Sequence, residues 1–134
     1  YPQVKVVHED LIVAAREHGY ALTLWGRRRP VLDIDARNPR DRGAAERIAI
    51  NTPLQGTAAD LIKIAMLRVS RRLAQEEAPA TLLLQVHDEL LLEVREEAVE
   101  DVARMVCEEM ERAAQLKVPI VVDAGWGHNW SEAH

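Results

Sequence analysis

The chain has 134 residues, of which 48% are hydrophobic and 29% charged, as is typical of one soluble globular domain. No apolar run approaches the roughly 20 residues of a membrane-spanning helix, and no basic-then-apolar leader opens the sequence. We therefore expect a soluble, cytoplasmic protein. The single cysteine, Cys107, excludes an internal disulfide, and the scarcity of aromatic residues argues against a stacking platform for single-stranded nucleic acid.

The net charge of −5 conceals an uneven distribution of charged residues. Residues 1–72 contain 13 Lys and Arg against 8 Asp and Glu, whereas residues 73–134 contain 4 against 14. This asymmetry predicts a nucleic-acid contact in the first half of the chain. In the second half it predicts either a solvated acidic face or carboxylates that bind cations.

The first elements along the chain are predicted to be a helix and a short strand. Apolar residues recur at intervals of three and four over residues 2–18, and Gly19 is typical of the position just after a helix. Residues 21–25 have the composition of a strand, which Gly26 ends. The triplet Arg27-Arg28-Arg29 is expected to be exposed, and together with Arg37, Arg40 and Arg42 it could neutralise phosphates. The alternative is that this run of charges is only a solvated loop.

Two long helices are predicted next. Asn38 followed by Pro39 is typical of an N-cap and a first helical position, so a helix should run to about residue 50. Pro53 should then interrupt the helical path. An apolar stripe over residues 54–75 predicts the longest helix of the chain.

Two apolar runs, residues 81–86 and 89–94, are separated only by His87 and Asp88, which is the spacing of a β-hairpin. Two-residue turns favour glycine-containing pairs because both central residues need positive φ, so two bulky polar residues are unfavourable there. Local rules are often broken at functional sites, which makes this turn a candidate site. Consecutive leucines in both strands suggest that both faces of the hairpin are covered.

After Glu96-Glu97 an amphipathic helix is predicted, with Cys107 buried on its apolar stripe, and Pro119 should open a last strand over residues 120–124. The order of elements predicts an α+β fold, in which helices cover one face of an antiparallel sheet with a central hairpin. We expect residues 1–134 to form a single domain.

Asp88 and Glu89 are the strongest candidates for chemistry. Mg²⁺ is often held by one or two carboxylates together with substrate phosphates, so the turn is a candidate magnesium site, although two carboxylates alone bind the ion poorly. The simplest alternative is a solvent-exposed polar turn. His87 could act as a base, a metal ligand or a hydrogen-bonding residue, and we predict hydrogen bonding, the commonest role of a lone histidine.

Arg47, Asn51 and Gln55 are spaced four residues apart and form one polar stripe if the helical path continues past Pro53. Arginine can contact phosphate or a base edge, and the two amides can donate to purine N3 and pyrimidine O2 in the minor groove. Such contacts would be independent of DNA sequence. The alternative is an ordinary solvated helix face.

Two strings of residues resemble the polymerase I-type DNA polymerases of family A. They are Gln55-Gly56-Thr57-Ala58-Ala59-Asp60 and Gln85-Val86-His87-Asp88-Glu89-Leu90. Supporting matches cover the whole chain: Tyr20 to Gly26-Arg27-Arg28-Arg29, Ala45-Glu46-Arg47 to Asn51, and Val118-Pro119 to Gly127-His128-Asn129-Trp130. The resemblance implies the C-terminal part of a polymerase palm, within a longer chain.

The resemblance also implies roles for individual residues. Asp88 would bind the catalytic Mg²⁺ ions, two in the complete site, with Glu89 shaping the site near the primer terminus. Arg47, Asn51, Gln55 and His87 would contact the template-primer duplex, chiefly along its minor groove. The implied reaction is nucleotidyl transfer from dNTP to the primer 3′ hydroxyl, in replication or repair of bacterial or phage DNA at the nucleoid.

The family's other metal-binding aspartate and its fingers helix, which grips the triphosphate, precede the matched residues and are absent from this sequence. We therefore expect the isolated chain not to polymerise, and self-association would cover surfaces that neighbouring subdomains normally bury. The alternative from another class is a non-catalytic, duplex-DNA-binding module of palm shape. A metal-dependent hydrolase built on His87-Asp88-Glu89 would need further ligands that the sequence does not offer.

Overall fold

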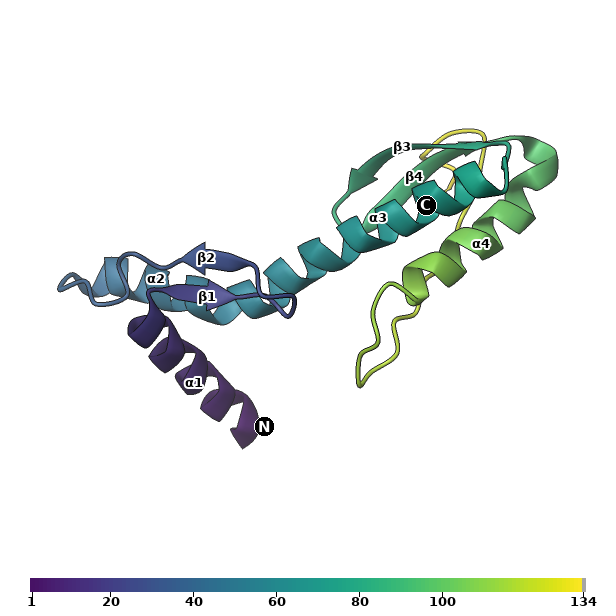
Figure 1. Cartoon of the computed structure of the whole chain (residues 1–134). Coiled ribbons are helices and arrows are strands. Elements are labelled where there is room, and N and C mark those ends of the chain that lie inside the picture. The colour runs from purple at the N-terminus through teal and green to yellow at the C-terminus, as the bar shows by residue number, and fades with distance from the viewer. Residues whose placement is uncertain (134) are drawn as a thin grey trace. The chain divides into compact units, whose positions relative to one another are not determined.

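The computed structural model describes residues 1–133. The chain forms two compact units, Tyr1–Asp60 and Leu61–His134 (Figure 1). Each unit contains its own cluster of buried apolar side chains. The fold is α+β with small antiparallel sheets, as predicted. None of the described helices combines the length and the apolar character of a transmembrane segment.

The first unit opens with helix α1 (Pro2–His18), which has the predicted bounds. Gly19 ends it with a φ of 76°, and its N–H donates to the Ala15 carbonyl at 2.9 Å. Strand β1 (Tyr20–Leu22) begins one residue before the predicted strand and pairs with β2 (Arg28–Pro30). The arginine triplet is exposed, as predicted. It is not a loop throughout, because the chain reverses at Gly26, with a φ of 78°, and Arg28 and Arg29 pair back onto β1.

Helix α2 (Pro39–Asn51) begins as predicted, and the Asn38 side chain accepts a hydrogen bond from the Arg40 N–H at 3.0 Å. The helical path then continues through a π-helix, η1 (Thr52–Gly56), into helix α3 (Thr57–Gln75). The interruption predicted at Pro53 is thus a widened turn rather than a break. Proline has no N–H and its ring clashes with the carbonyl four residues back, so a regular α-helix is excluded at this position.

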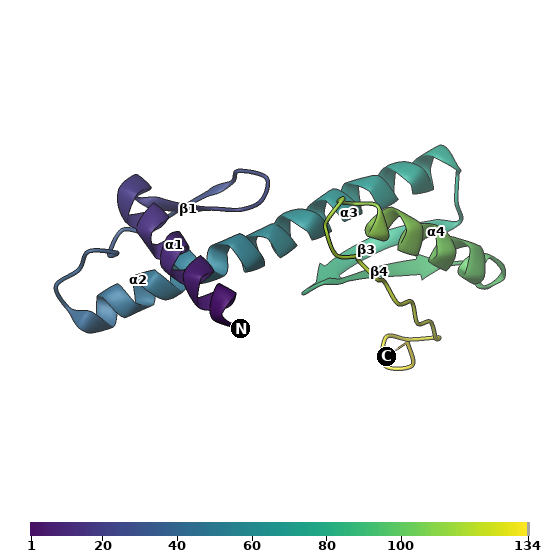
Figure 2. The same ribbon diagram turned by 90° about the horizontal axis from the view of Figure 1, so that it is seen from below.

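The second unit contains a hairpin of β3 (Ala80–Val86) and β4 (Glu89–Val94), a 3₁₀ turn η2 (Glu96–Ala98) and helix α4 (Val99–Glu111). Val86 pairs with Glu89, so the two-residue turn was predicted correctly. The helices α3 and α4 pack against the hairpin (Figure 2), around a buried cluster of Val69, Leu73, Val102, Met105 and Val106.

Only one face of the hairpin is covered within the described residues, contrary to the sequence prediction. The pairing register shifts between Leu82 and Leu84; Leu82 packs against the helical cluster, whereas Leu83 and Leu84 are 52% and 43% exposed. A bulge of this kind inserts one residue into a strand, so consecutive leucines do not require two buried faces.

Three further predictions for the second half are wrong. Residues 120–124 form no strand, and each sheet in the described part of the chain has two strands, so the hairpin is not the centre of a larger sheet. Cys107 is half-buried rather than buried. Partial burial raises the pKa of its thiol, and the negative charges of Glu111 and Asp123 raise it further.

Candidate functional site

The turn between β3 and β4 presents His87, Asp88 and Glu89 together at the end of the hairpin, and all three residues are exposed. His87 adopts a φ of 52°, whereas the φ of Asp88 is not positive. Only one of the two turn residues therefore adopts the left-handed conformation that hairpin turns favour. A non-glycine residue keeps the left-handed backbone conformation only where its surroundings hold it in that conformation.

Gln85 supplies such a constraint. Its side-chain amide donates a hydrogen bond to the His87 carbonyl, which joins the last residues of β3 to the turn. No role for Gln85 was predicted from the sequence. The available signal was its position two residues before His87, from which a local side-chain bond to a turn carbonyl can be expected.

The turn offers two adjacent carboxylates and no complete metal site. Among the described residues, no group of three or more His, Cys, Asp or Glu side chains lies in a position to hold a metal ion. The donor set fits Mg²⁺ in part, because that ion is commonly held by one or two carboxylates, water and substrate phosphates. Asp88 and Glu89 can therefore supply one side of a magnesium site, and the remaining ligands must come from elsewhere.

The predicted polar stripe lies in the other unit. Arg47 and Asn51 belong to α2 and Gln55 to η1, and all three are exposed. Their donors can therefore reach a ligand outside the chain. Because Gln55 lies within the wider π-turn, its direction depends on the geometry of η1 and not on the four-residue spacing alone.

Arg27 and Arg28, two of the arginines that could neutralise phosphates, have side-chain partners within the first unit. The Arg27 Nε atom forms an ion pair with Asp60 Oδ1 at 2.7 Å, and the Arg28 guanidinium lies 4.7 Å from the centre of the Tyr20 ring. Neither contact was predicted from the sequence, and Asp60 was expected to have no chemical role. Residues 27 and 60 are too far apart in sequence for any local pattern to join them.

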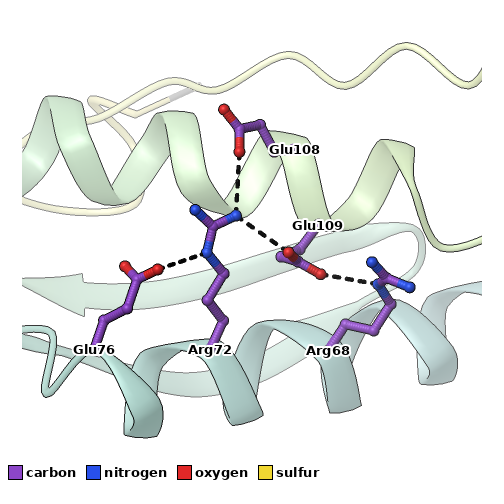
Figure 3. Close-up of polar contacts among 5 residues, drawn as sticks. All are labelled: Arg68, Arg72, Glu76, Glu108 and Glu109. Carbon is purple, nitrogen blue, oxygen red and sulfur yellow. Dashed lines mark hydrogen bonds and ion pairs between the residues drawn. The ribbon is translucent and has the colours of Figure 1, made fainter.

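An ion-pair network connects α3 and α4 in the second unit (Figure 3). Arg72 contacts Glu76, Glu108 and Glu109 at 2.8, 3.1 and 3.1 Å, and Arg68 contacts Glu109 at 2.9 Å. Burial alone would raise the pKa of the Glu109 carboxyl, but the hydrogen bonds from Arg72 and Arg68 outweigh it and hold the pKa below its ordinary value. The network braces the two helices that support the hairpin.

Comparison with known proteins gives a consistent result. Residues 1–132 match the family described as DNA polymerase family A. The chain is 49% identical over 134 residues to DNA polymerase I of Pseudomonas aeruginosa, and 46% identical over 133 residues to that of Lactococcus lactis subsp. cremoris. These alignments cover 100% and 99% of this chain but only 15% of each relative, so the chain spans less than a fifth of their length.

A solved structure is similar to this chain over almost its whole length. The POL domain of Pol1 from M. smegmatis, in complex with DNA primer-template and dNTP, superposes with a TM-score of 0.92 at 42% identity. The match covers 96% of this chain and 23% of the other. The sequence and structure comparisons therefore both confirm the family resemblance that the two strings of residues indicated.

Proposed function

The chain belongs to DNA polymerase family A, and we propose that residues 1–134 form the C-terminal part of the palm of a DNA-directed DNA polymerase. The complete protein would transfer nucleotides from dNTPs to a primer 3′ hydroxyl, in replication or repair of bacterial or phage DNA in the cytoplasm and at the nucleoid. The observation that carries the proposal is the exposed Asp88-Glu89 pair on a hairpin turn.

In this proposal Asp88 supplies a carboxylate ligand to the catalytic ions, and Glu89 lies beside it near the primer terminus. Two Mg²⁺ ions, when bound, would lower the pKa of the attacking hydroxyl and offset negative charge on the transferring phosphate. The protein's own contribution is to hold the carboxylates in place. The Gln85 amide fixes the turn through the His87 carbonyl, and the helices α3 and α4 support the strands that carry it.

The proposed partner is a template-primer duplex, contacted by Arg47, Asn51, Gln55 and His87. The exposure of all four side chains supports this role. Amide donors match the minor-groove acceptors that every base pair presents, so the contacts would hold DNA of any sequence. The M. smegmatis relative was solved with DNA primer-template and dNTP, which supports both partners.

We further propose that the 134-residue chain alone does not extend a primer, because its described residues hold too few ligands for a complete metal site. Exposed valines such as Val4 and Val7 on α1 would also favour self-association. Primer-template, dNTPs and Mg²⁺ incubated with the isolated chain should give no extended product. Template-directed extension would overturn this part of the proposal.

The main test is Asp88→Ala in the complete polymerase. Loss of a metal ligand should lower kcat by about 1,000-fold or more, since metal ions supply several kcal/mol of charge stabilisation. The Kd for primer-template should change by less than about threefold, because phosphate contacts dominate that affinity. Glu93→Ala is the matched control, since it removes an exposed carboxylate from the same hairpin and should leave kcat unchanged.

A non-catalytic duplex-DNA-binding module is the second candidate, favoured by the lack of a third metal-binding side chain among the described residues. Such a module would bind DNA with an affinity that falls steeply with salt. Its parent protein would show no incorporation that depends on Asp88. The same pair of variants therefore separates the two candidates.

A further inference from the structure

The turn between β1 and β2 contacts the π-helix η1, and we propose that Arg27 is a positioning residue for the DNA-contacting side chain of Gln55. The inference rests on the proposed function, because it assumes that Gln55 contacts the duplex. Arg27 itself is assigned no DNA contact. Its role is to hold the irregular turn in which Gln55 lies.

The backbone of the β1–β2 turn is fixed by Thr23, which is only 5% exposed. The Thr23 N–H donates to the Arg27 carbonyl at 3.0 Å, and the Arg27 N–H donates to the Thr23 hydroxyl oxygen at 3.1 Å. The Gly26 N–H donates to the Thr23 carbonyl at 3.0 Å. Arg27 therefore starts from a rigid position, which makes its side chain suitable for holding a neighbouring element.

The Arg27 guanidinium contacts η1 and the start of α3 at the same time. Its Nη2 atom donates to the Gly56 carbonyl at 3.1 Å, and its Nε atom pairs with Asp60, whose side chain is only 13% exposed. Beside it, the Leu24 N–H donates to the Thr57 hydroxyl at 2.9 Å. The planar guanidinium can make both of its contacts at once, which a lysine ammonium on a flexible stem does poorly.

The packing at Gly56 shows how closely the turn approaches η1. A Cβ atom added at Gly56 would lie 2.7 Å from the Thr23 methyl carbon. The end of the π-helix therefore lies directly against a buried, hydrogen-bonded side chain. Contact at this distance leaves η1 little room to move toward the β1–β2 turn.

Local sequence does not hold η1 in one conformation. Pro53 excludes regular α-helical hydrogen bonding at this position. A kink or a different irregular turn would accommodate the proline equally well. One residue more or less in the turn would rotate Gln55 by roughly 100° about the helix axis. The bonds from Arg27 and Leu24 select the π-turn, and through it the direction of Gln55.

The test is a double-mutant cycle in the complete polymerase, with the primer-template Kd measured by fluorescence anisotropy at several salt concentrations. Arg27→Gln should weaken binding about 3- to 10-fold, a coupling expected within one hydrogen-bond network. Combined with Gln55→Ala, it should weaken binding no further than Gln55→Ala alone. Asp60→Asn, which leaves Arg27 charged, should show the same non-additive pattern.

Arg29→Gln is the matched control, since it removes the same charge from β2 and should be additive with Gln55→Ala. If Arg27→Gln is additive and lowers the salt dependence by about one phosphate contact, Arg27 binds DNA directly and the inference is wrong. If it is additive with a lowered Tm, its role is only to stabilise the fold, which also overturns the inference. If Gln55→Ala has no effect on Kd, the proposed DNA contact fails first and the inference with it.

Discussion

Four of the six residues in the buried cluster of the Tyr1–Asp60 unit are alanine, whereas the buried cluster of the Leu61–His134 unit consists of valine, leucine and methionine. Small side chains let backbones approach closely, so the first unit depends on tight fit and on hydrogen bonds such as those of Thr23 and Arg27. The second unit buries larger side chains on amphipathic helices and adds the ion pairs between α3 and α4.

This difference in packing parallels a difference between the proposed functional residues of the two units. The proposed DNA contacts lie on a helix with an irregular π-turn, whose geometry needs support from outside the helix. The proposed metal ligand lies at the tip of a hairpin on a regular helical platform, and the irregular feature of the tip is the positive φ of His87. Substitutions should therefore act through packing volume in the second unit and through close contact in the first.

The largest effect is expected for Leu73→Ala in the second unit. Leu73 is 7% exposed within the buried cluster, so the substitution removes apolar burial and leaves a cavity. The free energy of unfolding should fall by about 2–5 kcal/mol. Leu67→Ala is the control on the same helix, and because Leu67 is 57% exposed the change should stay within about 0.5 kcal/mol. Equal effects in chemical denaturation would contradict this account of the core.

The next effect concerns the close approach in the first unit. Gly56→Ala should destabilise the protein by about 1–3 kcal/mol, because the new methyl group would clash with Thr23. Gly43→Ala is the matched control within α2, where an added Cβ would meet only Arg47 Nη1 at 3.8 Å. It should stabilise the helix by about 0.5–1 kcal/mol, since alanine is the better helix former. Thermal melts that show the same sign for both variants would refute the proposed fit.

The smallest effect is the pH dependence that Glu109 contributes to the second unit. Folding lowers the pKa of this carboxyl below its ordinary value of 4.5, so the stabilisation is complete above that value and is lost as pH falls through the lowered pKa. Glu109→Gln should therefore cost stability at neutral pH, and the difference from wild type should shrink in acid. Glu100→Gln, an exposed site on α4, serves as the control in the same denaturation series. A difference that stays constant with pH would show that Glu109 acts through packing instead.

Much of the secondary structure could be predicted because it follows from local patterns. The bounds of α1, the start of α2 at its asparagine cap and the two-residue turn after Val86 all follow from periodicity, capping and spacing. The errors occur where a distant segment determines the local structure. Arg28 and Arg29 form a strand because β1 pairs with them, and residues 120–124 form none because no strand pairs with them in the described structure.

For the candidate site, sequence by itself determined the residue types and their local spacing: adjacent carboxylates on a hairpin turn, and three polar side chains four residues apart. Only the tertiary structure decided how those residues are held. The pairing of Arg27 with Asp60 and Gly56 joins positions about thirty residues apart, and it contacts the end of the π-turn that contains Pro53. Hydrogen bonds between distant segments leave no periodic trace in a sequence, so neither the turn nor its support could be read from the residues alone.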